Sequence, residues 1–538
     1  MEVNQGQRAR LFYYCFLVLT AAFLYLSLFR LPFTPIFTGG DDNDYLINAA
    51  RMLEGQTIYR DFFEFVSPGL TVVNVGLFKL LGIRVWISEV LLIILGLGLT
   101  SLIVVISRKL LHGATAYLPA VLFLTCAFGF GLDDTEHWYS TLAELAAIAM
   151  VIERRTWIRL VASGAFCGLA SFFMQTQGVF TMVGLAIFLL WEGRGAGERW
   201  QEISRNLGCL IVSFVTMVLA MNAYFVYKAG LAQFLYCTAV FPFKYYSADR
   251  MSNSIYSVAF EFRGLLNWDA LPSLGVFLFI HSLLPLVYVC FWVQYRRKPL
   301  DPDCGASLML LSIVGFLQCV GLASAPTTFR LAAVTAPGLI LLIWLLRGQR
   351  MVPRVLNVAF WAVAACIAVG LPLRIQSEPM RILDLPRGRV AVDSAYYDSL
   401  LWWSQHTHPG EYVFAGAGTE ILFPLALRDP AEVRTVTTTD FTRPEQVRDI
   451  VTALEERRVR FVFWDSITDE EGAASSEDVP AVPTRAYLRR CYRALKTYLG
   501  GDYLPAGDHL APLRDYLHSR YHVVKTFSGT SQVWERNS

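Results

Sequence analysis

Three aspartates, Asp41, Asp42 and Asp44, follow two glycines soon after the first long apolar segment of the chain. An aspartate at the start of a helix commonly caps its N-terminus and suits the helix dipole. One carboxylate is enough for a cap, so capping leaves the other two unexplained. Carboxylates at the rim of a membrane lose solvation unless they are paired, bind a metal ion or act on a substrate. The cluster therefore predicts a functional site where membrane meets water, with capping as the alternative for one acid.

A second polar group, at residues 132–138, contains Asp133, Glu136 and His137. It forms a short turn between two apolar segments, where an acid can also simply cap the following helix. A His beside a carboxylate makes a divalent metal ion possible, but the spacing of these residues does not support a metal site. No motif requires a cofactor.

The composition places these acids in a membrane protein. Of the 538 residues, 55% are hydrophobic and 17% are charged, whereas an ordinary soluble domain has about a quarter charged residues. The apolar excess lies in long runs between residues 11 and 373, which excludes a disordered chain, a small disulfide scaffold and a simple cytosolic enzyme. The net charge of +2 provides no basic field for nucleic acid. The ten cysteines lie mostly in apolar runs without a CxxC pair, as buried hydrophobes do.

The apolar runs predict a polytopic α-helical membrane protein with about 11 transmembrane helices, since a bilayer core about 30 Å thick requires roughly 20 apolar residues in a helix. The predicted spans are 11–29, 85–107, 115–132, 138–152, 158–174, 178–192, 207–227, 273–294, 306–323, 331–346 and 355–373.

The positive residues predict the orientation of these spans, because cytoplasmic loops are enriched in Lys and Arg. With a cytoplasmic N-terminus, every inside loop has at least two positive residues, among them Lys109 and Arg159, and the outside turns at 133–137 and 175–177 have none. An odd number of spans then places residues 374–538 outside. The expected location is the bacterial inner membrane, with these residues in the periplasm.

Two domains follow from this division. Residues 1–373 are expected to form the membrane domain, with long outside loops at about 30–84 and 228–272. Loops longer than roughly 15 residues are usually functional or disordered, and these two are too aromatic to be disordered. Residues 374–538 alternate between strand and helix patterns, which predicts a C-terminal α/β domain with a mixed, largely parallel sheet. The predicted strands are 390–394, 412–416, 433–438, 459–464, 521–527 and 531–535, and the predicted helices are 396–406, 444–458, 485–499 and 510–519.

A short amphipathic helix is predicted at residues 43–54, where it would carry the first group of acids. Its apolar stripe would be buried in lipid or protein, and its polar stripe would face a cavity at the membrane interface. The apolar stripe comprises Leu46, Ala49, Ala50 and Leu53, and the polar stripe comprises Asp41, Asp44, Asn48 and Arg51.

The first outside loop resembles that of the GT-C glycosyltransferases, in particular the bacterial relatives of protein O-mannosyltransferase and of the lipid A aminoarabinose transferase. The similar segments are 40–45, 49–55, 59–63, Pro68 and 80–82. The resemblance implies a GT-C fold and a membrane glycosyltransferase. It aligns Asp41 with the proposed catalytic aspartate of the family and Asp42 with the second acid of the pair.

The same resemblance extends to the turn at 132–138. Asp133 resembles the acid of the aminoarabinose transferase branch, whereas Glu136 resembles that of other branches, and the residues leave both open as catalytic groups. The chain departs from the family at 67–69, where Ser-Pro-Gly replaces His-Pro-Pro or Lys-Pro-Pro, and at 174–177, where Met-Gln-Thr-Gln stands near a usual Lys-Gln.

The resemblance also implies the chemistry. Donors of the family are sugars on polyprenyl phosphate or diphosphate, and a carboxylate at the rim can act as general base on an acceptor hydroxyl. Direct displacement would invert the anomeric carbon. The leaving phosphate needs positive charge or backbone donors, and Arg330 and Lys244 are the first candidates. The expected substrate-binding residues are Asp44, Tyr45, Arg60, His137, Lys244, Tyr245 and Arg330.

The alternatives for some of these residues are structural. Arg330 could extend its guanidinium to lipid headgroups, and Phe243, Tyr245 and Tyr246 could form an aromatic belt at the interface instead of stacking on sugar.

The sequence therefore predicts a glycosyltransferase that moves a sugar from a polyprenyl-phosphate-linked donor to a lipid, glycan or protein acceptor at the outer membrane face. A transporter would instead show inverted repeats and ionisable residues near the bilayer midplane. A scaffold for polysaccharide assembly would tolerate Asp41→Asn. A ligase or polymerase of preassembled glycans is a further alternative.

Overall fold

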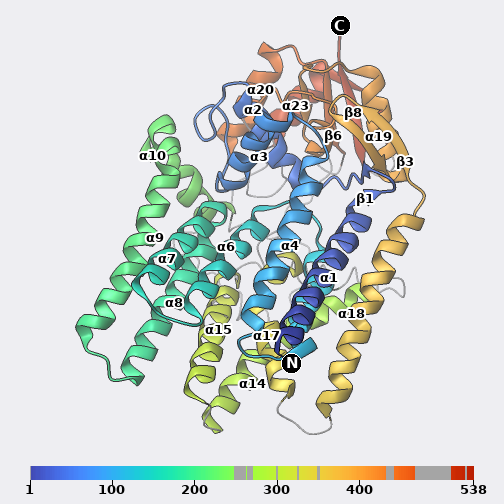
Figure 1. The fold of residues 1–538 in the computed structure, drawn as a ribbon. Coiled ribbons are helices and arrows are strands. Elements are labelled where there is room, and N and C mark those ends of the chain that lie inside the picture. Colours follow the sequence, from blue (N-terminus) through green and yellow to red (C-terminus); the bar gives the residue numbers. More distant parts are fainter. Residues whose placement is uncertain are drawn as a thin grey trace, which may run out of the picture.

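The computed structural model describes residues 2–246, 262, 271–297, 301–323, 326–347, 352–431, 442–466, 510–527 and 530–538. Long helices form a bundle, and a smaller region of strands and helices covers one end of it (Figure 1). The N-terminus lies at the opposite end from this C-terminal region (Figure 1).

Each of the eleven predicted spans falls on helical segments of the structure. By length and apolar composition alone, seven helices within the described residues could cross a membrane. The other predicted spans fall on shorter helices, so the total of eleven remains a prediction. The helices of the bundle are α1 (Glu2–Leu28), α4 (Ile87–Ser107), α5 (Leu118–Cys126), α6 (Glu136–Val151), α7 (Trp157–Phe173), α8 (Gln175–Gly195), α9 (Trp200–Ala229), α13 (Leu271–Leu278), α14 (Leu284–Arg297), α15 (Pro302–Gly321), α16 (Thr328–Ala333), α17 (Thr335–Arg347) and α18 (Val352–Ser377).

A buried polar network connects three of these helices. Glu144 of α6 is 1% exposed and accepts hydrogen bonds from Ser140 Oγ at 3.0 Å and from Gln318 Nε2 of α15 at 2.6 Å. Gln318 Nε2 also lies 3.0 Å from Thr181 Oγ1 of α8. The network satisfies polar groups that would otherwise be costly within an apolar bundle.

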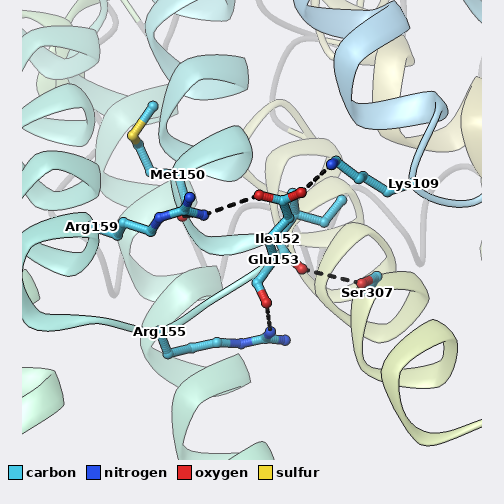
Figure 2. Close-up of polar contacts among 7 residues, drawn as sticks. All are labelled: Lys109, Met150, Ile152, Glu153, Arg155, Arg159 and Ser307. Carbon is cyan, nitrogen blue, oxygen red and sulfur yellow. Dashed lines mark hydrogen bonds and ion pairs between the residues drawn. The ribbon is translucent and has the colours of Figure 1, made fainter. Parts of the chain in front are cut away.

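The basic residues of several predicted inside loops meet at one end of the bundle. Glu153, in the turn between α6 and α7, lies between Lys109 and Arg159 (Figure 2). Arg155 of the same turn forms an ion pair with Glu192 of α8 at 2.8 Å. The ends of α4, α6, α7 and α8 therefore gather at one face, as a shared side of the membrane requires.

The first predicted outside loop folds into short elements that contact the C-terminal region. These are β1 (Phe29–Arg30), β2 (Thr34–Pro35), α2 (Asp42–Leu53) and α3 (Gly69–Leu81). The predicted apolar stripe of α2 packs on protein: Leu46 and Ala49 belong to a buried cluster that includes Leu400 and Trp403 of the C-terminal region. In the second loop, α9 is followed by α10 (Leu231–Leu235), a π-helical turn (Tyr236–Val240) and α11 (Phe241–Lys244). Residues 247–261 and 263–270 lie outside the described residues.

The described C-terminal residues form a hairpin of β3 (Arg381–Leu385) and β4 (Gly388–Val392) and a four-stranded sheet in the order β5-β6-β8-β7. Only β5 and β6 pair in parallel, so the expectation of a largely parallel sheet is wrong for the described strands. The reason is that β8 forms an antiparallel hairpin with β7 and also pairs antiparallel with β6 on its other side. The predicted strand 433–438 and helix 485–499 lie outside the described residues. The other elements are β5 (Val413–Ala415), β6 (Phe461–Asp465), β7 (Tyr521–Thr526), β8 (Ser531–Arg536), α19 (Ser394–His406), α20 (Pro444–Glu456) and α23 (Ala511–Arg520).

Candidate active site at the N-terminus of α2

The turn that precedes α6 holds the N-terminus of α2. The carboxylate of Asp133 accepts hydrogen bonds from the backbone N–H of Asp41 at 3.0 Å and of Asp42 at 3.1 Å. Asp41 occupies the N-cap position but makes no capping hydrogen bond with its side chain. Asp41 is therefore not the capping side chain, because an acid 92 residues further along the chain accepts these N–H groups.

Close approach at Gly40 makes this contact possible. A Cβ atom at Gly40 would lie 2.7 Å from Asp133 Oδ1, nearer than real Cβ atoms come to an oxygen. Burial, and then the negative charge of Asp41, raises the pKa of the Asp133 carboxyl to about 6. Burial, and then the charge of Asp133, raises the pKa of Asp42 well above its usual range. The Asp41 side chain is exposed.

Tyr45 connects α2 to the second acid of the turn. Its hydroxyl donates a hydrogen bond to Glu136 Oε2, and Glu136 Oε1 lies 3.6 Å from His137 Nε2. Tyr45 lies one helical turn after Asp41, which corresponds to a rise of about 6 Å. Asp133 and Glu136 thus both contact the first turns of α2, and the structure brings the two predicted acidic groups together.

Arg330 of α16 borders the same group. The charge of Arg330 acts on both Glu136 and His137, and its Nη2 donates a hydrogen bond to Tyr246 Oη at 2.7 Å. The neighbouring Phe329 ring packs edge-on against His137, with centroids 5.3 Å apart. The guanidinium is therefore held beside the acids of the turn.

The remaining predicted residues divide between two places. Asp44 Oδ1 accepts a hydrogen bond from Thr419 Oγ1 at 2.7 Å, which joins α2 to the C-terminal region. Arg60 forms an exposed ion pair with Asp61 at 2.6 Å. Two cations contact the Tyr245 ring: Lys244 Nζ lies 5.2 Å from the ring centroid, and Arg443 Cζ lies 4.2 Å from it.

The contacts described for Arg60, Lys244 and Tyr245 are with Asp61, with each other and with Arg443, and not with the acids of the turn. Arg250 and Arg263, two other cations of the second predicted outside loop, lie outside the described residues.

The sequence analysis did not identify Glu64 as part of this region. Glu64 is 3% exposed, accepts a hydrogen bond from Asn48 Nδ2 of α2 at 2.7 Å, and accepts others from the backbone N–H of Phe65 and Val66. One feature of the sequence could have identified it: Glu64 is an isolated acid within an aromatic run, and a buried acid must be hydrogen-bonded. Asp134, 1% exposed and bonded by Tyr139 Oη at 2.9 Å, was likewise given no role.

Metal ligation finds no geometric support in the described part of the chain. Within those residues, no group of three or more His, Cys, Asp or Glu side chains is arranged to hold a metal ion. The arrangement instead combines an exposed carboxylate, a helix N-terminus fixed by Asp133, and a cation beside Glu136. Such a set can take a proton from a hydroxyl on one side and stabilise a phosphate on the other.

The fold is similar to that of ArnT, a bacterial protein of known structure. The crystal structure of ArnT from Cupriavidus metallidurans bound to undecaprenyl phosphate matches with a TM-score of 0.55 and 12% sequence identity over 97% of each chain. The arabinofuranosyltransferase AftD from Mycobacteria matches with a TM-score of 0.46 and 14% identity over 97% of this chain and 40% of AftD. No protein-family model and no curated protein matches the sequence. The chain is an integral membrane protein with an ArnT-like GT-C fold, as the resemblance predicted.

Proposed function

We propose that the protein is a glycosyltransferase that moves a sugar from a polyprenyl-phosphate-linked donor to an acceptor at the outer face of the bacterial inner membrane. The ArnT-like fold supports a transferase that uses a polyprenyl-phosphate-linked donor, because the crystal structure of ArnT contains bound undecaprenyl phosphate. Residues 374–538 form the extracytoplasmic domain in this proposal, and the N-terminus is cytoplasmic.

The observation that carries the proposal is the contact between two acidic segments that are far apart in sequence. Asp133 holds the backbone of Asp41 and Asp42, and Glu136 binds Tyr45 on the next turn of the helix. A helix cap alone requires one of these contacts. The pair of contacts fixes the first turns of α2, which carry the exposed Asp41, against the turn whose Glu136 feels the charge of Arg330, and acid–base chemistry on a phosphate-linked sugar requires such positioning.

In the proposed reaction, Asp41 takes the proton of the acceptor hydroxyl as its oxygen attacks the anomeric carbon. The bond from that carbon to the phosphate oxygen breaks, and the phosphate leaves with the bonding electrons. Arg330 stabilises the charge that develops on the phosphate. The acceptor oxygen enters opposite the leaving group, so the product is inverted. Asp133 acts as a positioning residue, and Asp42, Glu136 and Tyr45 complete the acidic side of the site.

A transfer assay in membranes tests this function. Radiolabelled polyprenyl-phosphate sugars are supplied to wild-type protein, to Asp41→Asn and to the control Asp384→Asn, whose carboxylate forms an exposed ion pair with Arg389 on β4. We expect Asp41→Asn to lower the transfer rate about 100-fold or more, because general bases contribute about 10²–10⁴-fold. Equal rates for wild type and Asp41→Asn would reject the assigned base, and a product of retained anomeric configuration would reject direct displacement.

A further inference from the structure

A second charged site lies at the other end of α2. A pocket of about 100 Å³ opens between this helix and the C-terminal region. It is lined from the first loop by Arg51, Glu54 and Asp61 among others, and from the C-terminal region by residues between 387 and 457. Four arginines line it: Arg51, Arg387, Arg428 and Arg457.

The acidic residues of the pocket are already engaged. Glu54 forms an ion pair with Arg428 at 3.2 Å. Asp61 pairs with Arg60 at 2.6 Å and accepts a hydrogen bond from the backbone N–H of Thr57 at 2.7 Å. Asp429 Oδ1 accepts a hydrogen bond from the backbone N–H of Ala431 at 2.9 Å. Arg428 therefore has a carboxylate partner, and the charge of Arg51 acts on Asp61. The other two arginines form no ion pair in these contacts.

Arg387 and Arg457 are these two. Arg387 Nη1 donates to the carbonyl of Phe423 at 2.9 Å, and its guanidinium lies 4.5 Å from the Phe423 ring. Arg457 lies 4.4 Å from the Tyr412 ring. Neither forms an ion pair with any residue that the structure describes. Burial lowers the pKa of Arg387 to about 10, and the charge of Glu54 offsets this effect only in part.

We propose that this pocket binds a phosphate group through the guanidinium groups of Arg387 and Arg457. Arginine presents paired N–H donors that match a phosphate, and such charge-assisted bonds are strong where water is displaced. The volume is below the roughly 300 Å³ of ordinary small-molecule pockets, so it suits a group and not a whole sugar ligand. Arg51 lies nine positions after Asp42 on α2, a rise of about 14 Å, so the pocket is distinct from the candidate active site.

The proposal does not depend on sugar transfer, and a binding experiment tests it directly. The purified full-length protein carries Arg330→Gln throughout, so that the candidate active site contributes no arginine to phosphate binding. The melting temperature is measured with inorganic phosphate or chloride at equal ionic strength. In a second arm the protein is placed in nanodiscs of phosphatidylcholine with or without phosphatidic acid. The two arms distinguish a free phosphate from a lipid headgroup.

We expect phosphate to raise Tm by about 2 °C or more in one arm, because a ligand that binds the folded state stabilises it. Arg387→Gln with Arg457→Gln should abolish this shift, whereas Arg389→Gln on the exposed edge of β4 should keep it. Arg387→Lys retains the charge and should keep part of the shift if Arg387→Gln fails to fold. No shift in either arm, or an equal shift in the double variant, would overturn the proposal.

Discussion

At the residue scale, the position of Asp133 depends on the missing side chain of Gly40. In Gly40→Ala the new Cβ would displace the Asp133 carboxylate and break its hydrogen bonds to the backbone of Asp41 and Asp42. Bonds to a charged acceptor contribute about 1.5–3 kcal/mol each, so we expect the transfer rate to fall about tenfold or more. The matched control is Gly76→Ala in α3, where nothing lies within 4 Å of the added atom. Equal rates in the two variants would contradict the positioning role.

The titration of Asp133 gives a second prediction at this scale. Its ionised carboxylate accepts both backbone N–H groups, so the transfer rate should rise as pH increases through about 6, the raised pKa of this group. Stability should change in the opposite direction. Because the folded-state pKa is above the ordinary value of 3.8, the folded chain binds this proton more tightly, and its contribution to stability falls between about pH 4 and 6.

A pH–rate profile with thermal melts over the same range checks this prediction. Asp133→Asn should show a low rate without the inflection near pH 6. An unchanged inflection in that variant would assign it to another group.

Sequence reasoning identified most acids of the site but not how they meet. Asp41 and Asp42 were identified because carboxylates are rare and costly near a membrane, whereas Asp133 and Glu136 were identified through the family resemblance. The contact of Asp133 with the N-terminus of α2 could not be predicted, since it joins residues 92 positions apart and no local pattern encodes such a pairing. Arg60 and Lys244 show the converse: their charge made them candidates, but the structure pairs Arg60 with Asp61 and places Lys244 beside Tyr245.

At the element scale, Glu144 is expected to hold α6 against α15. Glu144→Ala would leave the amide of Gln318 without its acceptor carboxylate and remove the tie between these helices. Hydrogen bonds between membrane helices contribute about 0.6 kcal/mol on average and up to about 1.7 kcal/mol, so we expect a lower Tm of the detergent-solubilised protein. Glu144→Gln keeps an acceptor oxygen and should lose less. A Tm unchanged in Glu144→Ala would show that the network contributes nothing to stability.

The elements themselves were predicted from apolar periodicity and length. The helix predicted at 43–54 corresponds to α2, which begins and ends one residue earlier. The prediction was possible because the apolar stripe with Leu46 and Ala49 had to be buried. The sequence could not tell whether lipid or protein would cover that stripe, and the structure covers it with the C-terminal region. The local sequence could not predict the relative direction of the strands either. This direction depends on which strands become neighbours, as the antiparallel pair of β6 and β8 shows.

At the scale of the whole molecule, the prediction concerns topology. In a variant without native cysteines, we introduce either Asp398→Cys in α19 or Ala196→Cys after α8, both at exposed positions. A membrane-impermeant maleimide applied to spheroplasts should label the first and not the second, because the positive residues predict opposite sides for these segments. Labelling of residue 196 alone would invert the orientation, and labelling of both would show that the two positions share one side.

The attachment of α2 at Asp133 and Thr419 also has a consequence for biosynthesis. Residue 41 leaves the ribosome long before residue 133, and residue 419 follows much later still. A nascent chain that has inserted its first spans therefore carries the acids but lacks the partners that orient them. We expect such a chain to be inert, so that transfer begins only after Thr419 has been translated and has bound Asp44.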